Sequence, residues 1–266
     1  MMRLKVKEAA FSYDGKKNVF ENISFSVKEG EVFCILGPNG SGKSTLLKCL
    51  DKLLHLNNGR VYFDDKDLVS MSRKELAAYV GFLPQLHVST FPFTVAEVAV
   101  MGRSPHLSLA ASPSVEDYAL AEANLKMLGI AHLSEKPYTN ISGGERQLAL
   151  IAMVLTQQPR FLLLDEPTSH LDFGNQIRML NHIQALSKKG FSIILTTHFP
   201  DHAFHLSSTV AMMNEGNFMA LGNADEIITE KNLKKIYGID VQVSYVNSSK
   251  VCVPVKKIIT RIAQLK

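Results

Sequence analysis

Residues 37–45 decide the fold of this chain, and they read Gly37-Pro38-Asn39-Gly40-Ser41-Gly42-Lys43-Ser44-Thr45. This stretch fits the phosphate-loop pattern Gly-x-x-x-x-Gly-Lys-Ser/Thr. The apolar run at 32–36 before it is typical of a buried strand, and residues 45–54 after it have the spacing of a helix with one apolar side. A glycine-rich turn between a strand and a helix N-terminus directs backbone N–H groups at an anion, and the helix dipole adds positive charge there.

Two side chains of the loop carry its chemistry. Lys43 offers a full positive charge to β- and γ-phosphates, and Ser44 offers a hydroxyl ligand for Mg²⁺. The alternative is a glycine-rich turn that only caps a helix. Because the Lys-Ser pair directly follows the glycine spacing, the pattern favours a nucleotide phosphate site.

Composition sets limits on the class of protein. The chain has 266 residues, 46% of them hydrophobic, which is enough for one sizeable core or one domain with an inserted lobe. The net charge is +4 but Lys and Arg are scattered, so we expect no nucleic-acid partner. Three cysteines without metal-site spacing favour a reducing compartment. No signal peptide and no apolar stretch of about 18 residues is visible, so we expect a soluble protein that acts at a membrane only through a partner.

Hydrophobic periodicity predicts an α/β fold. Half-buried strands at 3–11 and 19–27, with another at 61–63 after an Asn57-Asn58-Gly59 turn, indicate a small antiparallel sheet. Compact apolar runs indicate strands buried in a parallel sheet, and helical spacing lies between two of them. These strands are expected at 80–83, 161–164, 192–196 and 210–213, and the helix at 175–186.

The predicted fold class is therefore a phosphate-loop NTPase core with a mostly parallel sheet, an N-terminal antiparallel β subdomain and an inserted helical subdomain. The pattern is helical from about 94 to 158, broken at Ser104-Pro105 and Ser112-Pro113. We expect one domain over 1–225, with the helical subdomain inserted at about 86–158. Residues 226–266 are expected to form a small α/β tail of the same domain.

A second group of polar residues follows the apolar run 161–164. Asp165 at the strand tip can hold Mg²⁺ opposite Ser44, and Glu166 can polarise an attacking water as general base. An apolar run ending in Asp-Glu is a weak signal alone, because strands often stop at acids. Its pairing with a phosphate loop strengthens the prediction.

A further anion site is indicated at Ser142-Gly143-Gly144-Glu145, directly before a helix expected at 147–155. The alternative is a plain N-cap at Ser142 followed by flexible glycines.

Taken together, these motifs resemble the nucleotide-binding subunit of an ATP-binding-cassette (ABC) transporter. They occur in the family's order: the loop 37–45, Gln85, the Ser-Gly-Gly signature 142–144, Asp165-Glu166, the segment 169–172, and His198 after a strand. The resemblance implies that two copies of the chain sandwich two ATP molecules, each between one copy's phosphate loop and the other copy's signature.

The resemblance also implies a role for each site residue. Lys43, Gln85, Glu166 and His198 would be catalytic, with His198 contacting the γ-phosphate and orienting Glu166 or the water. Mg²⁺ would be held by Ser44, Gln85 and Asp165. ATP would be bound by the residues of the loop and by a further set outside it. That set is Tyr13, whose ring would stack on adenine, Ser142, Gly143, Gly144 and Glu145 of the signature, and Asp172 near the partner copy's loop.

The sequence departs from the family's pattern at several positions. Ile141 replaces a leucine before the signature, and Glu145 replaces the commonest glutamine. Leu148 and Met153 stand on the following helix where many relatives have arginines. The first two changes are tolerable because Ser142 and the two glycines would contact the phosphate, and the last two bear on surface contacts rather than on ATP chemistry. Phe11 is an alternative to Tyr13 as the aromatic residue that stacks on adenine.

The segment Gly102-Arg103-Ser104-Pro105-His106 narrows the resemblance to ATPases of bacterial importers of ferric siderophores, haem and cobalamin. The tail Tyr237-Gly238-Ile239-Asp240-Val241 is similar to the same group. This resemblance implies two membrane permease subunits and, indirectly, a substrate-binding protein as partners, and a location at the cytoplasmic face of the membrane. It also leads us to expect that Arg103 and His106 donate to carbonyls at a helix end of the membrane partner. The alternative for 102–106 is a local helix stop.

Three other functions remain open at this point. An importer ATPase for molybdate, tungstate or another metal shares the architecture. A soluble ATPase of Fe–S cluster assembly or DNA repair shares the fold, as does a non-catalytic nucleotide-binding regulator. The intact Glu166 and His198 argue against the regulator, and the segment 102–106 argues against the soluble ATPases.

Overall fold

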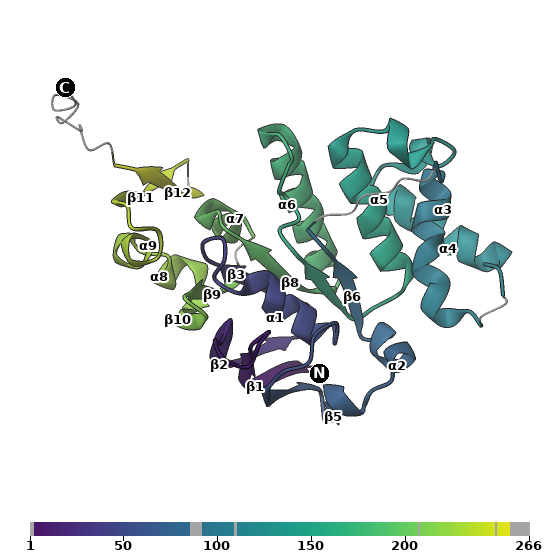
Figure 1. The fold of residues 1–266 in the computed structure, drawn as a ribbon. Helices are drawn as coiled ribbons and strands as arrows, with labels where there is room; N and C mark the ends of the chain where they lie inside the picture. Colours follow the sequence, from purple (N-terminus) through teal and green to yellow (C-terminus); the bar gives the residue numbers. More distant parts are fainter. Residues whose placement is uncertain (1–2, 86–91, 109–110, 207, 248, 256–266) are drawn as a thin grey trace, which may run out of the picture.

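The computed structural model describes residues 3–85, 92–108, 111–206, 208–247 and 249–255 (Figure 1). Figure 1 shows a group of helices, α3 to α5, at one end of the molecule and the C-terminal elements at the other, with the sheets and α1 between them. The predicted fold class is confirmed, since a mostly parallel sheet, an antiparallel sheet and a helical region are all present.

The central sheet has six strands in the order β10-β9-β3-β8-β7-β6. All neighbouring strands are parallel except β9 and β10, which form an antiparallel pair that the sequence did not predict. The strands are β3 (Val32–Leu36), β6 (Val80–Leu83), β7 (Phe161–Leu164), β8 (Ser192–Thr197), β9 (Thr209–Asn214) and β10 (Asn217–Asn223).

The inner strands are continuous apolar runs because both of their faces lie in a core. In β3, Cys34 and Leu36 belong to the core shared with α5 and α6, while Phe33 and Ile35 belong to the core shared with α1 and the antiparallel sheet. Burial on both sides is what a strand covered by two layers requires. The residues that follow these strands are therefore attached to a part of the chain that is buried on both faces.

The smaller sheet is antiparallel in the order β2-β1-β4-β5. Its strands are β1 (Arg3–Phe11), β2 (Phe20–Lys28), β4 (Asn58–Phe63) and β5 (Lys66–Asp67). The expected turn at Asn57-Asn58-Gly59 is wrong, because Asn58 and Gly59 belong to β4. Gly59 has a φ of 82°, and a Cβ there would lie 2.4 Å from the carbonyl oxygens of Lys7 and Glu8, so the glycine allows a close approach at a bulge in β1.

The helices largely follow the sequence pattern. The first ends four residues earlier than predicted, at Leu50, because Lys52 adopts a left-handed φ of 57°. The α-helices are α1 (Lys43–Leu50), α2 (Arg73–Ala77), α3 (Val95–Val100), α4 (Val115–Met127), α5 (Gly143–Thr156), α6 (Phe173–Lys188), α7 (Pro200–His205), α8 (Ala224–Ile227) and α9 (Glu230–Tyr237).

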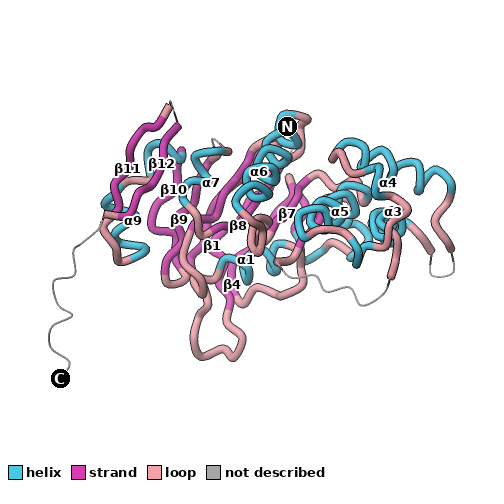
Figure 2. The backbone as a smooth tube through the Cα atoms, turned by 90° about the horizontal axis from the view of Figure 1, so that it is seen from above, coloured by secondary structure: helices cyan, strands magenta, loops and turns pink. Residues whose placement is uncertain are grey.

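The helical region packs α3, α4 and α5 against one another beside the central sheet (Figure 2). Ser104 and Pro105 lie inside a 3₁₀ turn (Met101–His106) that continues α3, rather than in a break. Each of the three α-helices begins with a capping box, in which the N-cap hydroxyl and the acid three residues later satisfy the first N–H groups. Thr94, Ser114 and Ser142 are the N-cap residues.

The C-terminal elements are α8, α9 and a hairpin of β11 (Val241–Val246) and β12 (Ser249–Pro254). Within the described residues, none of the helices combines the length and apolar character that crossing a membrane demands.

Candidate active site

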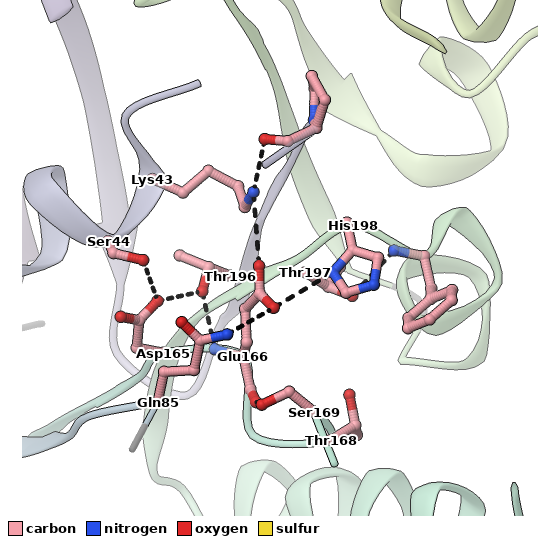
Figure 3. A network of polar contacts seen from close by, with 12 residues as sticks. Lys43, Ser44, Gln85, Asp165, Glu166, Thr168, Ser169, Thr196, Thr197 and His198 are labelled. Carbon is pink, nitrogen blue, oxygen red and sulfur yellow. Dashed lines mark hydrogen bonds and ion pairs between the residues drawn. The ribbon is translucent and has the colours of Figure 1, made fainter. Parts of the chain in front are cut away.

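Four parallel strands end at the same edge of the central sheet, and the predicted site residues follow these ends. Gly37 follows β3, His198 follows β8, Asp165 follows β7, and Gln85 comes two residues after β6. Open α/β sheets bind ligands at this edge. Figure 3 shows the side chains that gather there from separate segments of the chain.

The phosphate loop has a backbone that only glycine adopts easily. Gly40 and Gly42 have φ values of 80° and 104°, and a Cβ at Gly37 would lie 2.1 Å from the carbonyl oxygen of Met213. The buried hydroxyl of Ser41 has no hydrogen-bond partner among the described residues. The loop is therefore a tight backbone cradle that holds an unsatisfied polar atom.

Lys43 places its ammonium group at the centre of the loop. Its Nζ donates to the carbonyl oxygens of Gly37 and Pro38, both at 2.9 Å, and lies 3.6 Å from Oε1 of Glu166. Burial lowers the pKa of this ammonium below its ordinary value, and the carboxylates of Glu166 and Asp165 oppose the shift. A bound anion would add to that opposition and favour the charged form of Lys43.

Ser44 and Asp165 lie together, as the magnesium prediction requires. The Ser44 hydroxyl donates to Oδ1 of Asp165 at 2.8 Å, and the Thr196 hydroxyl donates to the same oxygen at 2.7 Å. Hydroxyl and carboxylate oxygens are the ligands that Mg²⁺ prefers. Among the described residues, no cluster of three or more His, Cys, Asp or Glu side chains could hold a metal by itself.

The carboxylate of Glu166 contacts Gln85 and His198 as well as Lys43. Its Oε2 accepts a hydrogen bond from Nε2 of Gln85 at 3.2 Å and also lies 3.2 Å from Nδ1 of His198. The His198 contact has ion-pair distance but not hydrogen-bond alignment, so that nitrogen is buried without a hydrogen-bond partner in the described structure.

The backbone of Glu166 is also unusual. Its φ is 46°, in the left-handed region, and its N–H donates to the hydroxyl of Thr196 at 2.8 Å. Strained backbone at a non-glycine residue is typical of functional sites, where the surroundings hold the residue in place.

Lys43, Ser44, Gln85 and Glu166 help to line an open pocket of about 270 Å³ beside the phosphate loop. Its lining residues are Val19, Asn39, Gly40, Gly42, Lys43, Ser44, Thr45, Gln85 and Glu166.

Tyr13 lies at the edge of this site. Its ring is 67% exposed, and its hydroxyl is 3.5 Å from the hydroxyl of Thr45 at the start of α1. Phe11, the alternative aromatic residue, is buried in the core and packs edge-on against Tyr13. Of these two rings, that of Tyr13 is the one exposed to a ligand.

The signature residues form a separate group at the start of α5. The Ser142 hydroxyl accepts the Glu145 N–H at 3.3 Å, and a Glu145 carboxylate oxygen accepts the Ser142 N–H at 2.7 Å. In the single chain, therefore, Ser142 is the N-cap that the alternative interpretation predicted. Ser142, Gly144 and Glu145 line a different pocket, and within the described residues it shares no lining side chain with the pocket at the phosphate loop.

Asp172 is connected to the signature through Asn175. It caps α6 by accepting the backbone N–H of Asn175 and its side-chain amide, both at 2.8 Å. The Asn175 side chain also packs against Gly144, where a Cβ would lie 3.0 Å from its amide carbon.

That Arg103 and His106 donate to a membrane partner stays a prediction, and within the single chain both side chains contact carbonyls at the end of α5. Arg103 donates to the Thr156 carbonyl at 3.3 Å, and His106 contacts the Gln157 carbonyl at 2.9 Å, both at the C-terminal end of α5. Arg103 also forms an ion pair with Asp117 at 2.7 Å. The positive charge of the Arg103 guanidinium suits the C-terminal end of a helix and its dipole, and both side chains contact the last carbonyls of α5 in their own chain.

Comparison with known proteins agrees with this geometry. The ABC transporter family model matches residues 20–169. This chain belongs to the ABC transporter ATP-binding family. As an ABC ATPase, it hydrolyses ATP to drive transport.

Several relatives of this ABC ATPase match over most of their length. It is 40% identical to an uncharacterised ABC transporter ATP-binding protein of Haemophilus influenzae, over 89% of this chain and 90% of the relative. It is 35% identical to the ferric enterobactin transport ATP-binding protein FepC of Escherichia coli, over 89% of this chain and 88% of the relative. It is 32% identical to the molybdate import ATP-binding protein MolC of Haemophilus influenzae, over 88% and 87%.

The fold of this ABC ATPase also matches a solved structure of an ABC transporter of metal-chelate type in an inward-facing conformation. The TM-score is 0.85 at 30% identity, and the match covers 97% of this chain and 99% of that chain.

Some residues of the site were not found from the sequence. Thr196 joins Asp165 to the backbone of Glu166, and the Thr-Thr pair directly before His198 was the only local signal for it. Asn175 connects Asp172 to the signature helix, and Tyr237 contacts the His198 backbone. Both depend on tertiary packing.

Proposed function

We propose that this chain is the ATP-hydrolysing subunit of an importer for a metal chelate of the ferric siderophore, haem or cobalamin type. The observation that carries the catalytic part is the convergence of Lys43, Asp165, Glu166, Gln85 and His198 at one sheet edge. The likeness to FepC and to a transporter of metal-chelate type supports the class of cargo.

The cradle fits a nucleotide triphosphate. The N–H groups at the start of α1 and the ammonium of Lys43 face the pocket and would bind the β- and γ-phosphates. The Tyr13 ring would stack on the base. Mg²⁺, held by Ser44, Asp165 and Gln85, would neutralise charge that develops on the transferred phosphoryl group.

Glu166 is the proposed general base. A water molecule attacks the γ-phosphorus, its proton passes to a carboxylate oxygen of Glu166, and the bond from the γ-phosphorus to the ADP oxygen breaks. Gln85 and His198 both lie 3.2 Å from Oε2 of Glu166, so they hold that carboxylate and the water in line. The Nδ1 of His198, which makes no hydrogen bond within the described residues, would contact the γ-phosphate or the water.

The signature is proposed to act on the ATP of a second copy. Ser142 and Gly143 are exposed at the N-terminus of α5, while the phosphate loop belongs to a different pocket of the same chain. A helix N-terminus binds phosphate well, so two copies related by symmetry would complete two sites. Asp172 and Glu145, beside this helix end, would then lie at the contact between the copies.

Two permease subunits would carry the cargo, with a substrate-binding protein delivering it, and the chain would act at the cytoplasmic face of the membrane. The likeness to MolC keeps molybdate as the second candidate cargo. Since no side chain of the site described above touches cargo in this mechanism, the site does not discriminate between them.

The test is transport by the assembled complex. The chain is purified with its membrane-spanning subunits, placed in lipid vesicles with the substrate-binding protein, and assayed for ATP-dependent uptake of a ferric siderophore, haem, cobalamin and molybdate in parallel. The same complex with Glu166→Gln is the control, and it should lose all uptake.

Uptake of one iron or cobalt chelate supports the proposal. Uptake of molybdate alone would overturn the cargo class but not the ATPase. ATPase activity without any captured membrane subunit would favour a soluble role in Fe–S cluster assembly or DNA repair.

A further inference from the structure

His198 lies just beyond the end of β8, where the sheet no longer holds the backbone. The residue before it is still fixed, because the Thr197 carbonyl accepts the Gly37 N–H at 3.2 Å. The residue after it is fixed locally, since the Phe199 N–H donates to the Thr197 hydroxyl at 3.1 Å. The carbonyl of His198 itself requires a partner from elsewhere.

Tyr237 provides that partner. Its hydroxyl donates to the carbonyl oxygen of His198 at 2.9 Å, across 39 residues of sequence. Tyr237 is the last residue of α9, so this bond joins the C-terminal elements directly to the segment that carries the proposed γ-phosphate contact.

The structure fixes the place of this hydroxyl well. Leu233 and Ile236 of α9 are buried in the main core, and the partly buried Tyr237 ring packs against the same core. Thr229 caps the start of the helix, and Gly238 ends it with a left-handed φ of 69°. An amphipathic helix anchored along one face gives its last side chain a defined position.

Two further observations support a lasting contact. Burial is the largest of the effects that raise the pKa of the Tyr237 hydroxyl, so it stays protonated and able to donate at neutral pH. A second bond ties the tail to the same region, because the Cys252 N–H donates to Oδ1 of Asp201 at 2.8 Å, and Asp201 lies in α7, three residues after His198.

We propose that Tyr237 is a positioning residue for ATP hydrolysis, which holds the backbone of His198 so that its imidazole meets Glu166 and the γ-phosphate. The inference rests on the proposed role of His198. Tyr237 touches neither ATP nor water in this mechanism and acts only through His198.

The test is a double-mutant cycle with Tyr237→Phe and His198→Ala, measured as ATPase kinetics of the full chain. Tyr237→Phe removes one hydroxyl and keeps the ring that packs against the core. We expect kcat to fall about three- to tenfold, the range expected for one neutral hydrogen bond, with KM and the calorimetric affinity for ATP unchanged. Tyr118→Phe, at a 43% exposed tyrosine of α4, is the matched control and should leave kcat unchanged.

The decisive comparison is Tyr237→Phe in the His198→Ala background. If Tyr237 acts through His198, the second substitution lowers kcat by less than about twofold further, because residues of one unit are not additive. If Tyr237→Phe lowers kcat in the His198→Ala background by the same factor as in the wild type, the inference is wrong. So would a normal kcat in Tyr237→Phe alone, while a normal kcat in His198→Ala would refute the role of His198 and the inference with it.

A second measurement guards against a general loss of stability. The imidazole NMR signal of His198, assigned with His198→Ala, should be displaced in Tyr237→Phe at an unchanged thermal unfolding midpoint. An undisplaced signal would contradict the proposal even if kcat had fallen.

Discussion

Lowering the pH should destabilise this ATPase through His202, a buried histidine four residues after His198. The His202 side chain lies in the core region with its Nδ1 3.0 Å from the Thr197 hydroxyl and 3.4 Å from the Thr168 hydroxyl. It therefore joins the end of β8 to the segment that follows Glu166. Burial, helped by the charges of His198 and His205, lowers the pKa of His202 to about 4.

The direction of the change in stability with pH depends on which state, folded or unfolded, binds the proton more tightly. The folded pKa lies below the unfolded value of 6.5, so the unfolded chain takes up the proton first as pH falls. The contribution of neutral His202 to the free energy of unfolding is fully present above about pH 6.5 and is lost as pH falls from there through about 4. With these two values, linkage gives a loss of about 2 kcal/mol between pH 8 and pH 5 from this residue.

Urea unfolding at pH 8, 6.5 and 5 measures this effect in the wild type and in His202→Gln, which removes the titratable imidazole and keeps a polar side chain. Other groups titrate in both proteins. Asp51, whose pKa burial raises to about 7, acts in the opposite direction by losing stability as pH rises through 7. The comparison of the two proteins at each pH cancels such effects and leaves that of His202.

We expect the wild type to lose about 2 kcal/mol more than His202→Gln between pH 8 and pH 5, a difference of roughly 0.7 M in the urea midpoint if m is about 3 kcal/mol per M. His55→Gln, at an exposed histidine, is the matched control and should follow the wild type. Equal pH dependence in wild type and His202→Gln would refute the reasoning.

Three further predictions concern the site and its support. Lys43→Ala should weaken ATP binding as well as turnover, because its charge acts on ground-state phosphates, and an unchanged calorimetric affinity would contradict this. Ser142→Arg protein should bind ATP without hydrolysing it, whereas mixing it with Lys43→Ala protein should restore some activity through heterodimers with one intact site. Failure to restore it would argue against shared sites. Arg103→Ala should lower the thermal midpoint more than Arg60→Ala does, since Arg103 is mostly buried against α5 while Arg60 is 63% exposed. Equal midpoints would show that the cap of α5 contributes nothing.

The sequence was sufficient where a feature depends on neighbouring residues. The phosphate loop, the apolar runs and the acids at the end of β7 are local patterns, and the sheet brings their ends together by a general rule of parallel strands. Contacts between segments far apart in the sequence could not be predicted from it. Nothing near Tyr237 indicates that its hydroxyl meets the carbonyl of His198, because the packing of α9 decides that.

The same reason explains the contacts that were missed and the one turn that was wrong. Arg103 and His106 are good donors, and the sequence did not show that the end of α5 would lie beside them. Gly59 was interpreted as a turn residue because glycine often occupies turns, yet it serves a close approach between two strands.

The most direct test of the account is the steady-state ATPase rate of Glu166→Gln beside its calorimetric affinity for ATP. The account requires a positioned general base that acts chiefly in the transition state, so turnover should fall by about 100-fold or more while ATP still binds and holds two copies together. Glu135→Gln, an exposed glutamate outside the site, should keep the wild-type rate. Undiminished turnover in Glu166→Gln would place the base elsewhere and contradict the central claim.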